Sequence, residues 1–189
     1  RLAFVDNLPD NKREFIFYGT PSADELYNED DLEMSIVNRA KIFHFGSISL
    51  VNDCLFAAAQ IAIGKARSKG ALISYDPNVR LNMWPSETAA RERIATCLRL
   101  ADIVKVSDEE MEIVTGTNEI EEALDIMILM GAKIAIITKG DSGIEYKWGA
   151  YRGYVPSYKV DMVDATGAGD SFAAGLLFQI AKQNKPISK

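Results

Sequence analysis

The stretch DATGAGDSFAAGLL occupies residues 164–177 of the 189-residue sequence. Three small residues, Gly167, Ala168 and Gly169, stand directly before Asp170, and apolar residues at helical spacing follow them. Small residues let a backbone come close to a ligand, and the first turn of a helix leaves N–H groups without partners. Because these N–H groups and the positive end of the helix dipole favour negative charge, we expect a phosphate or an oxyanion to bind here.

A carboxylate and a bound phosphate repel each other, so the presence of Asp170 beside an anion site needs a chemical reason. Asp170 suits the task of accepting a proton from a hydroxyl that attacks phosphorus. An acidic residue in the first turn of a helix also simply complements the helix dipole, and this alternative stays open.

Two familiar nucleotide-binding loops are absent. The sequence has no G-x-x-x-x-G-K-[ST] stretch, and Phe172 stands where the dinucleotide fingerprint needs its third glycine. A P-loop enzyme is therefore excluded, and an NAD-dependent oxidoreductase is a weak alternative.

Short apolar runs alternate with helical patterns through most of the chain. We expect strands at 41–46, 71–76, 101–106, 132–138 and 158–163, and helices at 51–69, 86–100, 107–114, 119–131 and after residue 167. This alternation predicts an α/β fold with a doubly wound, mostly parallel sheet flanked by helices. Residues 1–18 instead contain two β-prone runs around a turn-rich segment, which indicates an antiparallel pair. No domain boundary is visible, so residues 1–189 are expected to form a single domain.

Polar residues follow the expected strands at the point where each strand ends. The stretches DPNVR (76–80), SDEE (107–110), TKGDSG (138–143) and DATGAGD (164–170) all come directly after an apolar run. Because ligands of such sheets bind beyond the carboxyl ends of the strands, we expect the active site at this edge.

Composition and charge exclude several classes of partner. The formal net charge is −6 and no tract of Lys or Arg occurs, so nucleic acid and acidic membrane surfaces are poor partners. No apolar stretch is long enough to cross a bilayer, and Cys54 and Cys97 have no metal-ligand spacing. We expect a cytoplasmic protein with free thiols that binds small molecules.

Five blocks of the sequence resemble the ribokinase-type (PfkB) sugar kinases, and among them the bacterial fructokinases. In chain order they are HFGSIS, SYDPNVR, ADIVKVSDEEM, ITKGDSG and DATGAGDSFAAGLL. The resemblance implies a ribokinase-like fold with part of a small β lid, to which residues 1–20 contribute antiparallel strands. It implies ATP-dependent phosphorylation of a sugar primary hydroxyl, with fructose as first choice and ATP, Mg²⁺ and K⁺ as cofactors. Ribose, 2-keto-3-deoxygluconate and a non-catalytic regulatory relative stay open as alternatives.

The resemblance gives the glycine-rich stretch its roles. It implies that Asp170 is the base and that the amides of Gly167, Ala168 and Gly169 form the anion hole. The backbone at Asp164 and Thr166 matches a monovalent-cation site in relatives, and a hydrophobic or capping role for this pair is an equal alternative.

Other positions carry over with alternatives. Glu110 is implied to organise Mg²⁺ through water, although Ser107 replaces the usual Asn, and S-x-x-E is also a capping box. The nucleotide phosphates are implied to contact Lys105, Thr138, Lys139 and Gly140, where solvated surface charge is the alternative for both lysines.

The DPNVR stretch resembles a site near the sugar and the transferred phosphate. Asp76, Asn78 and Arg80 are implied to lie there, and a simple turn is the alternative. We expect the lone His44 to be a hydrogen-bonded core residue.

The chain opens with RLAFVD, without Met, and stops soon after the helix that follows residue 167. We therefore expect it to be part of a longer kinase whose N-terminal and C-terminal portions are missing. Relatives often pair through the lid, so a homodimer is one alternative, and the oligomeric state stays open.

Overall fold

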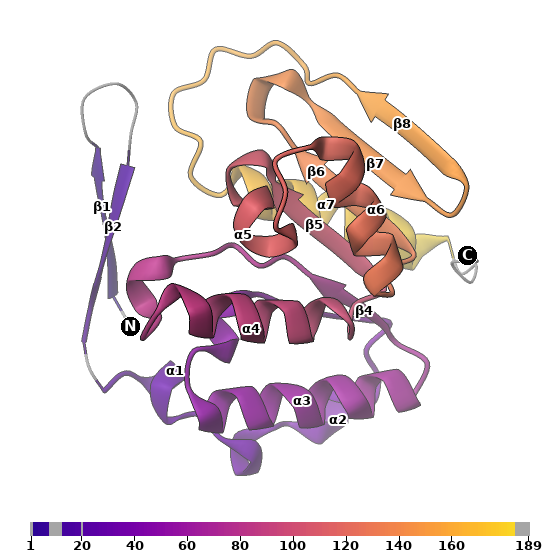
Figure 1. The fold of residues 1–189 in the computed structure, drawn as a ribbon. Helices are drawn as coiled ribbons and strands as arrows, with labels where there is room; N and C mark the ends of the chain where they lie inside the picture. Colours follow the sequence, from indigo (N-terminus) through magenta and orange to yellow (C-terminus); the bar gives the residue numbers. More distant parts are fainter. Residues whose placement is uncertain (1, 8–12, 20, 184–189) are drawn as a thin grey trace.

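The computed structural model describes residues 2–7, 13–19 and 21–183 of the chain. Its centre is a six-stranded sheet with the strand order β3-β4-β5-β6-β7-β8 (Figure 1). Strands β3 to β6 pair in parallel, and β7 and β8 are added in antiparallel fashion. The strands are β3 (Ile42–Phe45), β4 (Leu72–Tyr75), β5 (Ile103–Ser107), β6 (Ile134–Thr138), β7 (Ile144–Trp148) and β8 (Tyr151–Val155). The expected α/β architecture with a mostly parallel sheet is confirmed.

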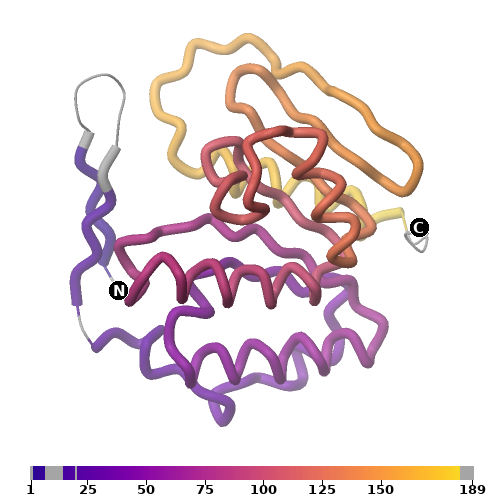
Figure 2. Tube along the Cα trace, in the orientation of Figure 1, coloured from indigo at the N-terminus to yellow at the C-terminus, as the bar shows by residue number. Residues whose placement is uncertain are grey.

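Helices cover both faces of this sheet. The longer ones are α3 (Asp53–Ser68), α4 (Glu87–Leu98), α6 (Ile120–Met130) and α7 (Ala168–Lys182). Short ones are α1 (Ala23–Leu26), η2 (Glu29–Asp31), α2 (Met34–Val37), η3 (Ser47–Leu50), η4 (Leu81–Met83), η5 (Asp108–Glu110), α5 (Met111–Thr115) and η6 (Gly140–Ser142). In Figure 2, α3, α4 and α6 lie in front of the sheet and α7 lies behind it. In the described part of the chain, no helix has the length and apolar character needed to span a membrane.

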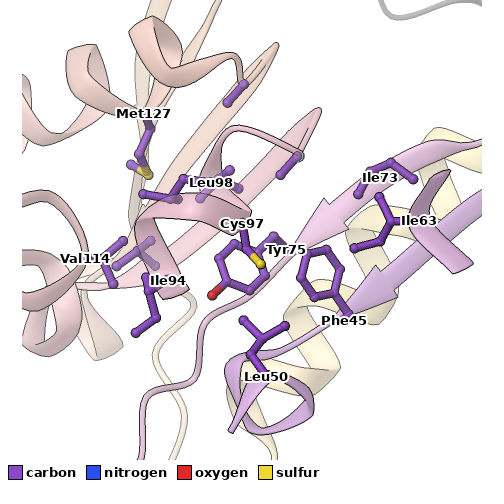
Figure 3. Close-up of a cluster of buried hydrophobic side chains, with 14 of the residues drawn as sticks. Phe45, Leu50, Ile63, Ile73, Tyr75, Ile94, Cys97, Leu98, Val114 and Met127 are labelled. Carbon is purple, nitrogen blue, oxygen red and sulfur yellow. The ribbon is translucent and has the colours of Figure 1, made fainter. Parts of the chain in front are cut away.

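The main core lies between the sheet and helices α3, α4 and α6. Alternate strand residues point into it, so that Phe45 and Tyr75 stack with their ring centroids 4.6 Å apart (Figure 3). The buried face of α3 consists mainly of alanines, which lets the helix lie close to the strands. A second, smaller cluster joins Ile103, Ile134 and Ile136 on the other face of the sheet to the apolar side of α7. The position of α7, and of the glycine-rich stretch that begins it, is therefore fixed by packing on the sheet.

The sequence signals for helix ends have clear counterparts in the structure. The side chain of Asn52 accepts a hydrogen bond from the N–H of Leu55 at 2.7 Å, and Ser86 accepts one from Ala89 at 3.1 Å. Gly131 ends α6 with a φ of 128°, which favours glycine. These local bonds set where the helices between the strands begin and end.

Two expectations about strands need correction. Residues 158–163 do not form a strand, because no strand of the described chain pairs with them, and the side chain of Val163 is 98% exposed. The β7–β8 pair was not expected, and it extends the sheet beyond β6.

The predicted antiparallel pair near the N-terminus is confirmed as β1 (Leu2–Asn7) and β2 (Arg13–Tyr18). Figure 1 shows this pair standing apart from the six-stranded sheet. The turn expected between the two strands lies outside the described residues.

Candidate active site

Helix α7 begins at the glycine-rich stretch. Gly167 has a φ of 78°, a left-handed backbone conformation that favours glycine. The N–H of Ala168 donates to the carbonyl oxygen of Ala165 at 3.1 Å, so one of the three amides expected to bind an anion is used within the chain. The N–H groups of Gly167 and Gly169 have no acceptor among the described residues. Two of the three expected amides therefore remain available to an anion at this helix start.

Asp170 follows in the first turn of α7 and is exposed to solvent. Partial burial lowers the pKa of the His44 imidazole. The nearby negative charges of Asp76 and Asp170 oppose this change. Asp170 therefore lies near the carboxyl ends of β3 and β4, where the sequence predicted the site.

His44 is not the core residue that we expected. In β3, Phe45 points into the main core, so the neighbouring His44 lies on the opposite face of the sheet, where it is exposed. Its Nδ1 lies 3.0 Å from the hydroxyl oxygen of Ser74. The alternation of IFHFG carried this information, because a residue between two inward-facing aromatic residues must face outward.

Lys105 and Asp76 form a buried ion pair at the same edge. The Nζ atom of Lys105 lies 3.0 Å from Oδ2 of Asp76, and their side chains are 11% and 6% exposed. Burial raises the pKa of the Asp76 carboxyl, and the nearby Lys105 charge opposes this change. The other carboxylate oxygen, Oδ1, is buried and has no hydrogen-bond partner within the described residues. A side-chain cation is thus held in place beside the start of α7.

The loop after β4 is fixed by contacts to several elements. Asn78 has a φ of 43°, an uncommon value for a residue other than glycine. The N–H of Val79 donates to Oε1 of Glu110. The guanidinium of Arg80 lies 4.9 Å from the centre of the Phe15 ring, and its Nη1 donates to the carbonyl oxygen of Val79 at 2.9 Å. In this structure Arg80 is therefore engaged with strand β2, and neutralisation of phosphate charge by Arg80 stays a prediction.

Ser107 and Glu110 form the capping box that the sequence offered as an alternative. The hydroxyl and N–H of Ser107 donate to Oε2 of Glu110 at 2.8 and 3.3 Å. With Val79 on Oε1, both oxygens of this carboxylate accept hydrogen bonds from the protein.

The described residues also contain no group of three or more His, Cys, Asp or Glu side chains that could hold a metal ion. The structure does not fit a Mg²⁺ ion held by the protein alone. Mg²⁺ commonly binds to proteins together with the phosphates of a nucleotide and keeps several of its waters.

The third expected group lies at the end of β6. The hydroxyl of Thr138 is 3.5 Å from the carbonyl oxygen of Val106, the outer limit of a hydrogen bond. The Nζ atom of Lys139 lies 2.6 Å from Glu145 and 5.1 Å from the centre of the Tyr154 ring. Gly140 follows with a φ of 53°. Lys139 is thus paired within the protein and is not a solvated surface charge, and its contact with the nucleotide stays a prediction.

The pair before the glycine-rich stretch forms a local turn. The N–H of Thr166 donates to Oδ1 of Asp164 at 2.7 Å, as in an Asx turn. The N-cap of α7 is Gly167, which has no side-chain cap bond, so this pair does not cap the helix, and the monovalent-cation site stays a prediction.

A cavity of about 500 Å³ lies on another side of the DPNVR loop. Its lining includes Asn78 and the turn after β3, but not Asp76, Lys105 or Asp170. The cavity and the sheet edge that carries Asp76, Lys105 and Asp170 are therefore different places on the surface.

Comparisons with known proteins agree with this geometry. Residues 1–189 match the family described as pfkB family carbohydrate kinase. Fructokinase-2 of Zea mays is 45% identical over 184 residues, which cover 97% of this chain and 55% of the maize protein. The chain therefore spans about half the length of such relatives.

Solved structures agree with the family match. The fructokinase of Xylella fastidiosa with bound ATP matches with a TM-score of 0.86 at 29% identity. The match covers 96% of this chain and 56% of the Xylella chain. A putative ribokinase II from E. coli in complex with ATP and Mg²⁺ has a TM-score of 0.82 at 29% identity, with 96% of this chain and 56% of that one covered. The chain belongs to the pfkB family of carbohydrate kinases.

Proposed function

We propose that the protein transfers the γ-phosphoryl group of MgATP to the primary hydroxyl of fructose, giving fructose 6-phosphate. The observation that carries the proposal is the convergence of three kinds of group at the start of α7. These are the exposed carboxylate of Asp170, the unpartnered amides of Gly167 and Gly169 among the described residues, and the buried ammonium of Lys105. The substrate choice is supported by the curated fructokinases, which are 40–45% identical to the chain.

Each group has a distinct task in the proposed reaction. Asp170 accepts the proton of the sugar hydroxyl as its oxygen attacks the γ-phosphorus. The two glycine amides and the positive end of the α7 dipole stabilise the charge on the phosphoryl oxygens. Lys105 adds a cation that the Asp76 carboxylate holds in position.

The nucleotide is assigned to the edge formed by β5 and β6. Thr138 and the turn at Gly140 offer a hydroxyl and an amide to its phosphates, and Lys105 adds a positive charge. The Mg²⁺ ion enters with ATP, as in the E. coli relative whose structure holds both. A K⁺ ion beside the backbone of Asp164 and Thr166 completes the proposal, and replacing K⁺ by tetramethylammonium tests it.

We propose that two copies pair through the outer face of the β1–β2 pair. Leu2 and Phe4 of β1 lie opposite Tyr18 and Ile16 of β2, so the four apolar side chains share one face. All four are more than half exposed, at 61, 56, 69 and 51%. Such an apolar face is typical of a protein interface. A cytoplasmic location is part of the same proposal, because both cysteines are free thiols.

The test compares the intact protein with its Asp170→Asn variant on fructose, ribose and 2-keto-3-deoxygluconate. We expect fructose to be the best substrate and the variant to lose about 10²–10⁴-fold in kcat, because general-base catalysis contributes that much. Asp161→Asn, in the exposed segment before the helix, is the matched control and should keep full activity. Unchanged turnover in Asp170→Asn would refute the assignment of the base, and binding without turnover in the unaltered protein would favour a regulatory relative.

A further inference from the structure

Glu110 has a structural task that its place in the sequence does not reveal. Its Oε1 accepts the N–H of Val79, and its Oε2 accepts the N–H and the hydroxyl of Ser107. Val79 belongs to the loop after β4, and Ser107 is the last residue of β5. One carboxylate therefore joins the loop that carries Asn78 and Arg80 to the neighbouring strand of the sheet.

This loop needs such a fixed point because its backbone is strained. Asn78 has a φ of 43°, and a non-glycine residue keeps this conformation only where the surroundings hold it. On one side of Asn78, the carbonyl oxygen of Pro77 accepts the N–H of Ser47 at 2.8 Å. On the other side the bond to Glu110 is the one that fixes Val79. Asn78 is thus held between two hydrogen bonds.

The same loop supports strand β2. The side chain of Asn82 donates to the carbonyl oxygen of Phe15 at 3.2 Å, and the Arg80 guanidinium stacks over the Phe15 ring. Arg80 also donates to the carbonyl oxygen of Val79, the residue that Glu110 holds. Contacts therefore run without a break from the end of β5 through Glu110, Val79 and Arg80 to β2.

We propose that Glu110 is a positioning residue, which clamps the Val79 amide and so sets the geometry of the DPNVR loop and the seating of β2 on it. This inference rests on the proposed function, in which the sugar binds beside that loop. The carboxylate acts here on the protein backbone, and loss of the clamp should weaken sugar binding.

The first measurement is hydrogen exchange of the Val79 amide in the intact protein without ligands. A hydrogen bond to a charged group is worth about one to two powers of ten in an equilibrium constant, so Glu110→Ala should speed this exchange about tenfold or more. Ser107→Ala is the matched control, because it removes a donor to Oε2 and keeps the bond to Val79. In Ser107→Ala the exchange rate of the Val79 amide should stay within about twofold of that in the unaltered protein, because the bond to Glu110 remains. An unchanged Val79 exchange rate in Glu110→Ala would overturn the proposal.

The second measurement is kinetic and uses Glu110→Gln, which keeps an acceptor for Val79 but can no longer accept from both donors of Ser107. We expect the KM for fructose to rise in the order Ser107→Ala, Glu110→Gln, Glu110→Ala, reaching about tenfold or more in the last. A KM for fructose in Glu110→Ala that stays at the value of the unaltered protein would overturn the clamp. The exchange measurement needs no turnover, so it tests the clamp even where the protein proves not to phosphorylate fructose.

Discussion

The Nζ atom of Lys105 lies 3.1 Å from the point that a Cβ atom would occupy at Gly169. The two residues come from the middle of β5 and the first turn of α7, which are more than sixty positions apart in the sequence. The absence of a side chain at 169 lets the helix start come this close to the ammonium. Positive charge from a side chain and from a helix dipole therefore meets at one place, beside Asp170.

Gly169→Ala tests whether this close approach matters. The new methyl group would push against the end of a flexible side chain, so we expect little change in stability, and alanine gains up to about 1 kcal/mol in helix propensity. Displacement of the cation should lower kcat/KM about tenfold or more, since small shifts in an active site are costly to the rate.

The matched control for this prediction is Gly175→Ala in the same helix. A Cβ at Gly175 meets no atom within 4 Å. The control should gain stability and keep its activity. Equal activities of the two variants would show that the contact between Gly169 and Lys105 has no role in the reaction.

Much of the sheet could be predicted because its signals are local. Strands buried on both faces are short apolar runs, and residues such as Ser86 and Gly131 mark helix ends through bonds to their nearest neighbours. The convergence of Asp76 and Lys105 followed from strand topology, since parallel strands end at one edge.

The errors concern hydrogen-bond partners that the sequence pattern does not reveal. Residues 158–163 alternate like a strand, but a strand needs a partner, and the sequence does not say whether one is present. The Ala168 amide was expected to be free, but the turn at Ala165 supplies an acceptor that composition cannot reveal. The bond of Glu110 to Val79 was not foreseen, because it joins residues 31 positions apart.

The raised pKa of Asp76 predicts how stability depends on pH. Burial raises this pKa above the ordinary value of 3.8, so in the window between the two values the folded state keeps a proton that the unfolded state releases. The contribution of Asp76 to stability is therefore present at low pH and is lost as the pH rises through the folded-state pKa.

Urea unfolding of the unaltered protein and of Asp76→Asn, in steps from acid to neutral pH, measures this effect. At low pH, position 76 is neutral in both forms. The free energy of unfolding of the unaltered protein should there exceed that of Asp76→Asn by the largest amount. This difference should shrink as the pH rises through the window. The other carboxylates titrate alike in both forms, so their contributions cancel from the difference. A difference that instead grows with pH would mean that the Lys105 charge outweighs burial.

The two cysteines should differ sharply in reactivity. Cys54 is exposed, whereas Cys97 is fully buried and burial raises its pKa to about 12. A thiol reagent at pH 8 should label Cys54 within minutes and Cys97 only after denaturation, because the thiolate is the reacting form. Mass spectrometry of the labelled peptides gives the extent at each position. Rapid labelling of Cys97 in the native protein would contradict the packing of α4 on the sheet.

The outer face of the β1–β2 pair predicts the oligomeric state. Phe4 is 56% exposed and lies opposite Ile16, at the centre of the four apolar side chains of that face. A charge there would be buried without a partner in a dimer, so Phe4→Lys should convert dimers to monomers and weaken association at least about a hundredfold. Sedimentation velocity over a range of concentrations measures the change. Leu129→Lys, at an 88% exposed position of α6, is the matched control and should leave the mass unaltered. Dimers that persist in Phe4→Lys would exclude this face as the interface, and a monomeric unaltered protein would exclude the pairing itself.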